Sequence, residues 1–438
     1  MRIVFTLTLV LFSINGLLAQ QQILSKEEAI KQALENNYGI KIAANNVKIA
    51  NNNKHILNSG FLPTISASGG TTFNIDNSSA EFSNGTTAKV TGAESSRYNA
   101  GLNLNYTLYD GQGRKYNYEQ LKTTYNLAEL QARETIENTI YQLFTVYFNV
   151  ARLAENVALF EESLQISKDR LTRVNYMFDY GQSTKLSVLN AEVDVNNDSI
   201  QLLNSRQELI NAKRDLNVVM GNRQHPNYEV VTEVNFQLHP VKEELYQQVL
   251  QNNVVLQQIE QQVRISDFQL KANKAGYLPT LGLTGSYGWN KSNNNAASNV
   301  LFSSNSGFSG GINLSWNLFD GGGTKTRVHN AKIEIENQQL IKAEAILQIE
   351  TDFNNAWEDY QNKLFILATQ EKNVQTNQNN FNRTEEQFKL GQINSLEFRQ
   401  AQINLINAEN AKNAAKYDAK LAELQLLQLS GTLMDTEF

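Results

Sequence analysis

The sequence predicts a mixed fold of α-helices and membrane β-strands, arranged as two internal repeats. Three observations support this prediction. Residues 98–113 and 308–323 both alternate strictly between apolar and polar side chains, a pattern typical of a β-strand with two unlike faces. Only 4 prolines occur in 438 residues, which favours long uninterrupted helices. The same order of helix, strand and turn signals occurs in each half of the chain, which indicates a duplicated unit.

The first residues have the composition of a secretory signal peptide. Arg2 precedes an apolar run over residues 3–18, and Ala19 supplies the small residue expected at a cleavage site. We therefore assign residues 1–19 to a signal peptide. The apolar run is shorter than the roughly 20 residues that span a bilayer, and no later stretch reaches that length without charge. The mature chain is therefore expected to have no transmembrane helix.

The two repeats are expected to cover residues 20–231 and 232–438. Each opens with an amphipathic helix, from Ser25 to Gly60 and from Val241 to Gly276, and Ser25 begins the first one with a capping-box pattern. The two opening helices are 216 residues apart, whereas the later Asp-Gly turns and helix tips are 210 residues apart. The difference of 6 residues falls between the two strands of each repeat, where a surface loop tolerates a change of length.

Each repeat is expected to contribute two strands, at about 62–75 and 97–109 and at about 278–290 and 308–319. Asn-, Ser- and Gly-rich loops are predicted between them, at about 75–97 and 291–307. One face of the strands is apolar, and the other carries Asn, Ser, Thr and Gly with almost no charge. Lipid outside and water inside would require such faces, although a soluble sheet with one solvated face also fits. The residues expected to face lipid are Leu102, Leu104, Tyr106, Leu283, Ile312, Leu314 and Trp316.

Long helices are predicted at 112–180 and 322–390, and shorter returning helices at 185–220 and 394–430. A helix over 112–180 would be about 104 Å long, which roughly equals the opening and returning helices placed end to end. This match predicts an antiparallel coiled coil with one continuous helix beside two shorter ones. A near-heptad spacing supports it, at Ile349, Phe353, Ala356, Tyr360, Leu364 and Leu367. A soluble helical bundle would explain the helices but not the strand pairs.

Four strands with a lipid-facing side cannot stand alone, because they leave two unpaired edges that hydrocarbon does not tolerate. Closed outer-membrane barrels begin at 8 strands, so the chain is expected to associate with copies of itself. Two copies would give 8 strands and three would give 12, and the strand count leaves both open. Small Gly, Ser and Asn residues on the inner face favour an open lumen, and therefore the larger barrel.

The sequence carries no arrangement of residues that would support catalysis, so we do not expect an enzyme or a cofactor. There are no cysteines, and the net charge of −6 gives no footprint for nucleic-acid binding. Four histidines, His55, His225, His239 and His329, lie far apart in the sequence and match no metal motif. The glycine-rich stretch at 321–326 lacks the spacing of a phosphate-binding loop.

Several short motifs occur twice, in the same order and at matching distances. They are GFLP at 60–63 and GYLP at 276–279, LYDG at 108–111 and LFDG at 318–321, and Tyr180-Gly181 and Leu390-Gly391. Together they resemble the TolC-like outer membrane factor family over essentially the whole mature chain. The resemblance implies a homotrimer with a 12-stranded barrel in the outer membrane of a Gram-negative bacterium. It also implies an α-helical tunnel in the periplasm.

The resemblance further implies an exit duct for a tripartite efflux pump or a type I secretion system. Its partners would be outer-membrane lipid, a periplasmic adaptor (membrane fusion protein) and an inner-membrane transporter. Carried over from the family, the adaptor-docking tips would be Gly181, Gln182, Ser183, Gly391, Gln392 and Ile393. The exported cargo is left open. A structural or adhesive coiled-coil surface protein and a general diffusion porin are the alternatives, but the first needs no twin strands and the second no long helices.

The family also implies a gate near the tips, formed by acidic residues just after the tip glycine of the second repeat. Glu397 stands at the first matching position, but the second is Gln400 rather than an acid. One ring of three Glu397 side chains is therefore the prediction, with Arg399 as a neighbour that could offset its charge. An ordinary exposed helix glutamate is the alternative.

Overall fold

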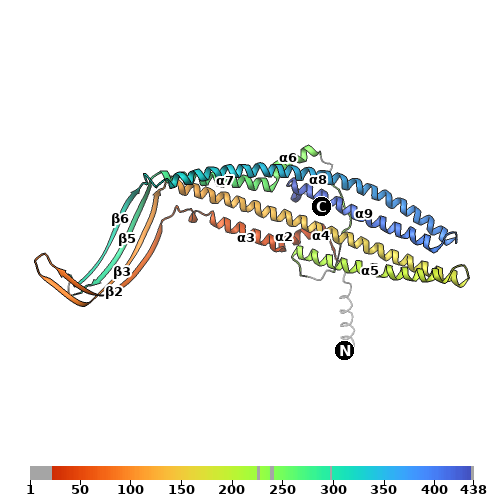
Figure 1. Ribbon diagram of the computed structural model, residues 1–438, viewed down its shortest axis with the longest axis horizontal. Helices are drawn as coiled ribbons and strands as arrows, with labels where there is room; N and C mark the ends of the chain where they lie inside the picture. Colours follow the sequence, from red (N-terminus) through yellow and green to blue (C-terminus); the bar gives the residue numbers. More distant parts are fainter. Residues whose placement is uncertain (1–21, 224–226, 237–240, 296–297, 436–438) are drawn as a thin grey trace, which may run out of the picture. The chain divides into compact units, whose positions relative to one another are not determined.

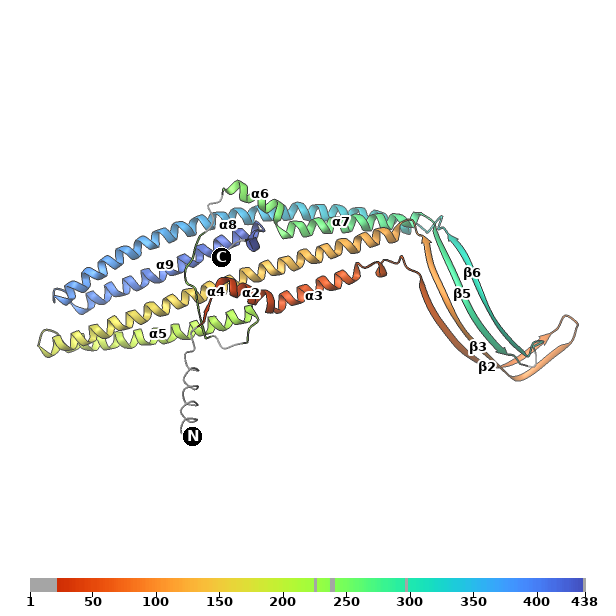
Figure 2. The same ribbon diagram turned by 180° about the vertical axis from the view of Figure 1, so that it is seen from behind.

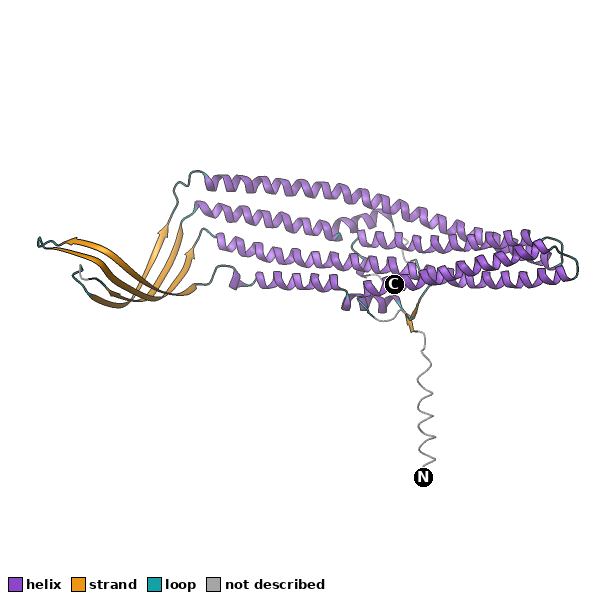
Figure 3. Cartoon of the chain, turned by 60° about the horizontal axis from the view of Figure 1, so that its bottom comes forward, coloured by secondary structure: helices purple, strands orange, loops and turns teal. Residues whose placement is uncertain are grey.

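The computed structural model describes residues 22–223, 227–236, 241–295 and 298–435, so the proposed signal peptide lies outside the described residues. The chain divides into two compact units. The first comprises residues up to 46, 130–257 and those from 344 onward, and the second comprises 47–129 and 258–343. The first unit is mostly helical, whereas the second contains the large β-sheet (Figure 3). In the described part of the chain, no helix has an apolar stretch long enough to cross a bilayer.

The structure has the mixed helix and sheet class that the sequence predicts, with helices in the majority. The long helix α4 (Gly113–Asp179) is followed by α5 (Lys185–Met220), and α8 (Gly323–Lys389) is followed by α9 (Ser395–Leu429). Figure 2 shows α5 running back beside the end of α4, and α9 beside the end of α8. The shorter helices are α2 (Lys26–Asn36), α3 (Tyr38–Asn53), α6 (Lys242–Asn252) and α7 (Val254–Lys274), and the 3₁₀ turns are η1 (Ile56–Asn58), η2 (Ala275–Tyr277) and η3 (Leu433–Asp435).

The predicted opening helices at 25–60 and 241–276 are not continuous, which corrects the sequence analysis. Asn37 interrupts the first one: its side-chain oxygen accepts hydrogen bonds from the N–H groups of Gly39 and Ile40, at 2.8 and 3.2 Å, and so caps α3. Its side-chain amide donates to the carbonyl oxygen of Val219 on α5, at 2.8 Å. Asn253 interrupts the second helix in the same way and donates to Leu429 on α9, at 3.0 Å. Both breaks therefore depend on a contact with a distant helix.

The capping box predicted at the start of the first helix is half present. The hydroxyl of Ser25 accepts a hydrogen bond from the backbone N–H of Glu28 at 3.2 Å, as an N-cap residue does. The carboxylate of Glu28 does not return the bond to Ser25. It accepts instead from the side-chain amide of Gln32, at 3.0 Å, because that residue lies one turn along the same helix face.

The core of the first unit forms where α2, α4, α5 and α9 meet. Phe144, Phe148 and Leu216 are fully buried there, and the rings of Phe144 and Phe148 stack with centroids 5.7 Å apart. The predicted coiled-coil seam on α8 is confirmed, since Ile349, Phe353, Ala356, Tyr360 and Leu367 are all less than 9% exposed and Leu364 is partly buried. These contacts hold the returning helices against the long ones.

Two short strands that the sequence analysis did not predict also belong to the first unit. β1 (Gln22–Leu24) pairs in parallel with β4 (Tyr228–Val230). The buried hydroxyl of Tyr147 on α4 lies between them, donating to the carbonyl oxygen of Leu24 at 2.8 Å and accepting from the N–H of Val231 at 3.0 Å. Burial raises the pKa of Tyr147 to about 12, so its hydroxyl keeps its proton at neutral pH. This one side chain connects the start of the chain to the segment that joins its two halves.

The second unit contains a four-stranded antiparallel sheet in the order β2-β3-β5-β6. Its strands are β2 (Thr64–Glu81), β3 (Thr87–Tyr109), β5 (Thr280–Asn293) and β6 (Phe302–Ser315). Asp110 and Asp320 follow the sheet and begin the long helices: Asp110 accepts from the N–H of Arg114 at 2.8 Å, and Asp320 from that of Thr324 at 2.7 Å. The hydroxyl and N–H of Thr324 together hold the pKa of Asp320 below its ordinary value.

The strand bounds differ from the predicted ones, and the predicted loops are much shorter. β2 continues to Glu81, and β3 begins at Thr87, so the two strands pair through most of the predicted loop. The pairing contains a bulge, at which the N–H of Gly92 donates to the side-chain oxygen of Asn77 at 2.9 Å. This part of the hairpin has no partner in β5 and extends beyond the rest of the sheet (Figure 1). Cross-strand pairing therefore overrode the turn-forming composition of residues 75–97. In the other hairpin, β6 begins at Phe302 instead of residue 308 and ends before the predicted residue 319.

We predict that Tyr147→Phe lowers the free energy of unfolding by about 1–3 kcal/mol, because it leaves the buried carbonyl of Leu24 and the partly buried N–H of Val231 without their partner. Tyr180→Phe is the matched control, since Tyr180 is 81% exposed. Urea unfolding followed by circular dichroism measures both. Equal stability of the two variants would contradict the proposed role of the Tyr147 hydroxyl.

Candidate functional site

The two helix hairpins of the first unit end in similar turns. The turns contain Gly181 and Gly391, with φ of 75° and 71°, a conformation that glycine adopts without strain. The residue after each glycine donates its backbone N–H to a carbonyl oxygen in the preceding helix. Gln182 donates to Met177 at 2.7 Å, and Gln392 donates to Gln387 at 2.9 Å. These turns place the six predicted docking residues at the two ends, where Gly181, Gln182, Gly391 and Gln392 are exposed and Ser183 and Ile393 are half-buried.

Each turn also exposes two large apolar side chains: one before the glycine, which belongs to the repeated tip motif, and one after it, which the sequence analysis did not single out. They are Tyr180 and Leu186 in the first turn, 81% and 66% exposed, and Leu390 and Leu396 in the second, 71% and 75% exposed. The two residues of a pair stand at equivalent places, directly before the glycine and on the first turn of the returning helix. Exposed apolar side chains gathered at one place are typical of a surface that binds another protein.

An apolar cluster, here called the tip core, joins the two hairpins behind the turns. It comprises Val174, Val188, Phe381, Phe388, Phe398 and Ala401 from α4, α5, α8 and α9. The rings of Phe388 and Phe398 stack with centroids 4.9 Å apart. Arg173 on α4 donates to the carbonyl oxygen of Lys389 at the end of α8. The tips are therefore packed against each other within one chain.

Two arginines and two aspartates, here called the Arg–Asp network, tie the same hairpins together by charge. Arg399 on α9 binds Asp198 on α5 through two hydrogen bonds of 2.6 and 2.8 Å. Arg170 on α4 binds Asp194 on α5 at 2.5 Å and donates to the carbonyl oxygen of Ser395 at the start of α9. Burial lowers the pKa of Arg170 and Asp194 opposes that shift, but a guanidinium stays charged in proteins. The network is electrically neutral, so neither arginine is buried without a counter-charge.

A buried amide extends the Arg–Asp network toward the middle of the hairpins. Gln402 on α9 is 1% exposed and donates to the carbonyl oxygen of Ser163 on α4, at 2.9 Å. Its side-chain oxygen accepts from Arg399 at 3.1 Å. Pulling α9 away from α4 would leave these buried polar groups without partners until water reached them.

The three gate candidates do not form one cluster within the chain. Glu397 is exposed, and its carboxylate accepts from the N–H of Asn394 at 3.1 Å while the Asn394 side chain accepts from the N–H of Glu397 at 2.9 Å. This reciprocal pair is a capping box at the start of α9. Arg399 does not offset the charge of Glu397 within the chain, because it faces the opposite side of α9 and binds Asp198.

Gln400 is exposed, and its side-chain amide donates to Asn404 one turn further along α9, at 2.9 Å. In the described part of the chain, Gln400 forms no hydrogen bond with Glu397 or Arg399. Sequence reasoning missed Arg170, Asp194 and Asp198, because their partners lie on other helices and no local spacing marks them.

The large sheet has two faces of opposite character. On the first face, the strand register places Leu104, Gly285 and Gly310 side by side on β3, β5 and β6. Two residues along the strands in one direction, the same face holds Leu102, Tyr287 and Phe308. Two residues in the other direction, it holds Tyr106, Leu283 and Ile312. Leu314 shares the same face, opposite Leu281. Six of the seven residues predicted to face lipid thus lie on one face of the sheet, where Leu102, Ile312 and Leu314 are 52%, 69% and 66% exposed.

The opposite face carries hydroxyl and amide groups. Ser286 and Ser309 share a hydrogen bond of 2.8 Å there, and Asn103 lies beside Ser286 in the register. Trp316 lies outside the sheet, because β6 ends at Ser315, and its indole N–H donates to the carbonyl oxygen of Tyr277 at 3.1 Å. Its prediction as a strand residue was therefore wrong.

The histidines do not form a site in the described part of the chain. His55 caps the short turn η1 by accepting from the N–H of Leu57 at 3.3 Å, and His329 is exposed on α8. His225 and His239 lie outside the described residues. Among the residues that are described, no group of three His, Asp or Glu side chains is arranged to hold a metal ion.

We predict that Arg399 and Asp198 couple by roughly 1–3 kcal/mol in a double-mutant cycle with Arg399→Leu and Asp198→Leu, because residues of one partly buried hydrogen-bond network depend on each other. The exposed pair Arg206–Glu161 is the control, with side chains 52% and 47% exposed, and should couple by less than about 1 kcal/mol. Urea unfolding gives all the required values. Coupling of Arg399 and Asp198 no greater than that of the control would show that the network does not tie the hairpins together.

Comparison with known proteins identifies the family. A family model described as outer membrane efflux protein matches residues 29–222 and 245–432. Outer membrane efflux protein BepC of Brucella suis is 22% identical over 406 residues, 92% of this chain and 85% of that protein. Outer membrane protein TolC of Vibrio cholerae is 23% identical over 352 residues, 78% and 79% of the two chains. The CmeC outer membrane channel of Campylobacter jejuni has the same fold, with a TM-score of 0.73 at 16% identity over 93% of this chain and 86% of that one. The family model covers most of the sequence, and the chain belongs to the outer membrane efflux protein family.

Proposed function

We propose that this protein is the outer-membrane exit duct of a tripartite efflux pump or a type I secretion system. One observation carries the proposal: a sheet with two free edges, one apolar face and one polar face rich in Ser, Thr and Asn, in a chain of the outer membrane efflux protein family. Lipid on one side and water on the other suit such a sheet. The duct is passive, and its sheet lies in the outer membrane while its helices stand in the periplasm.

The free edges favour association of identical chains. β2 and β6 are the outer strands, and their unpaired N–H and C=O groups would be costly in hydrocarbon. Joining β6 of one copy to β2 of the next removes every edge once the ring closes. We propose a trimer with a 12-stranded barrel, in which each chain contributes two copies of an internal repeat.

The helices of the first unit support the same association. α5 carries a row of exposed apolar residues with the spacing of a coiled-coil seam, and α8 exposes Leu347 and Phe365 by 67% and 72%. Within the described residues, no helix of the same chain covers these side chains. A second copy of the chain would bury them. The row on α5 comprises Leu189, Val193, Ile200, Leu203 and Ile210.

We propose that the tips dock the periplasmic adaptor and that the duct opens near them. The exposed apolar pairs beside Gly181 and Gly391 give the adaptor a surface to bind. The tip core and the Arg–Asp network then hold the two hairpins together at rest. An adaptor that stabilises separated hairpins would open the duct, because it would replace the contacts that are lost.

Trimer formation is the first prediction of this proposal. Amine-reactive crosslinking of isolated outer membranes should give a product of three chains, and the purified protein should conduct ions in planar bilayers. A monomer found in the soluble periplasmic fraction would contradict the proposal.

The second prediction concerns Glu397. Glu397→Gln keeps a side chain able to complete the capping box but removes the charge, so the turn should keep its structure. If three Glu397 carboxylates surround the narrowest point, the variant should show weaker block by divalent cations in single-channel recordings. Glu358→Gln, in the middle of α8, should be blocked like the parent. Unchanged block in Glu397→Gln would assign this residue to capping alone.

A further inference from the structure

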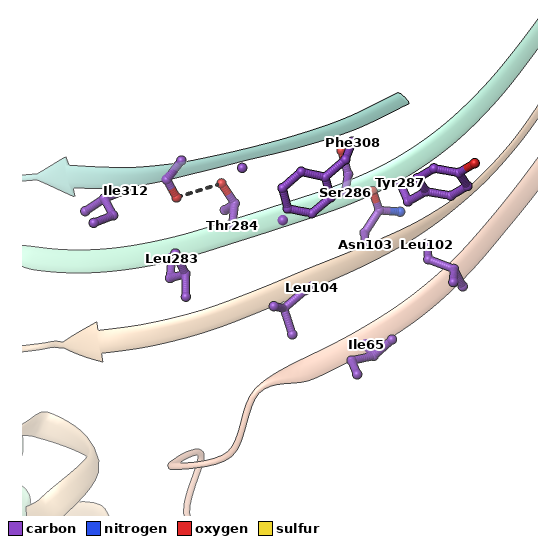
Figure 4. Close-up of a pocket in the computed structure, with 13 residues that line it drawn as sticks. Ile65, Leu102, Asn103, Leu104, Leu283, Thr284, Ser286, Tyr287, Phe308 and Ile312 are labelled. Atoms are coloured by element: carbon purple, nitrogen blue, oxygen red, sulfur yellow. Dashed lines mark hydrogen bonds between the residues drawn. The ribbon is translucent and has the colours of Figure 1, made fainter. Parts of the chain in front are cut away.

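The apolar face of the sheet contains a hollow of about 520 Å³, and all four strands contribute to its lining (Figure 4). Its floor is the pair Gly285 and Gly310, which lie opposite each other on β5 and β6. Leu104 bounds the floor on β3. Tyr287 with Phe308 forms one wall, and Leu283 with Ile312 forms the other. Each wall stands two residues from the floor, which is about 7 Å along the strand.

The hollow exists because glycine has no side chain. A Cβ atom added to Gly310 would meet two ring atoms of Phe308 at 3.4 Å, and one added to Gly285 would meet Leu104 at 3.7 Å. The ring of Phe308 thus leans toward the floor without filling the space. Phe308 is 79% exposed and Ile312 is 69% exposed, so no other described part of the chain covers the hollow.

The chemistry of the lining restricts the occupant. No charged side chain takes part, and the walls named above are aromatic or aliphatic, although Asn103, Thr284 and Ser286 also border the hollow. The hollow extends over all four strands, and its floor lies between β5 and the outer strand β6. A volume of 520 Å³ is within the range of about 300–1,000 Å³ found for small-molecule sites. A flexible hydrocarbon chain fits this shape better than any polar ligand.

We propose that the hollow binds an acyl chain of a phospholipid, a proposal that rests on the outer-membrane function above. The floor lies five residues from Thr280, where β5 begins after the helical segment. In a duct whose helices stand in the periplasm, this depth belongs to the periplasmic leaflet, which supplies phospholipid. A bound acyl chain would fill the depression and give the barrel an even outer surface.

Photolabelling of the unaltered protein tests the site. The trimer is reconstituted with phosphatidylethanolamine that carries a diazirine on one acyl chain, irradiated, digested and mapped by mass spectrometry. Peptides with Leu283–Tyr287 and Phe308–Ile312 should carry several-fold more adduct than peptides with Phe73 or Ala67, which share the apolar face outside the hollow. Even labelling of the whole face would overturn the proposal.

Native mass spectrometry of a filled hollow gives the second test. Gly310→Leu places a side chain on the floor and should reduce the phosphatidylethanolamine retained by the trimer several-fold. Gly307→Leu is the matched control, because it lies on the opposite face with nothing within 4 Å of an added Cβ. Equal retention by the two variants, or none by the parent trimer, would refute the acyl-chain site. If the unaltered protein were detected only as a monomer in native mass spectrometry, that result would refute the proposed duct instead.

Discussion

The unpaired backbone groups along β2 and β6 are the constraint on which the rest of this structure depends. A sheet of four strands with an apolar face on one side and serine, threonine and asparagine on the other is not stable alone in lipid or in water. Closing a ring of such sheets satisfies the edges, the apolar face and the polar face at once. The glycines at 285 and 310 then leave a depression on the outer surface, which lipid can fill.

The helices face a different problem, because very long hairpins are stable only where they are packed along their length. Asn37 and Asn253 each stop one helix, start the next and bind the end of a returning helix, so these breaks also lock α5 and α9 in place. At the far end, the tip core and the Arg–Asp network hold the two hairpins together. The partly buried, doubly hydrogen-bonded pairing of Arg399 with Asp198 is costly to break within the chain, which is suitable for a closure that opens only when a partner binds.

Sequence periodicity predicted much of this architecture because it reports on burial. The seam from Ile349 to Leu367 has a helical period because one side of that helix packs against other helices. The alternation around Leu102 and Leu104 has a period of two because the two faces of a strand meet different surroundings. The breaks at Asn37 and Asn253 could not be predicted, since each needs a carbonyl from a helix far away in the sequence. The Arg–Asp network was missed for the same reason. The extended β2–β3 hairpin was missed because pairing between strands outweighs local turn composition.

The two faces of the sheet can be tested directly because the chain contains no cysteine. Single cysteines at Leu102, Asn103, Leu104 and Asn105 on β3 would be treated in intact outer membranes with a water-soluble, membrane-impermeant maleimide. The account predicts fast labelling at Asn103 and Asn105, which face water, and slow labelling at Leu102 and Leu104, which face lipid. Equal labelling rates at all four positions would contradict a sheet that separates lipid from a water-filled lumen.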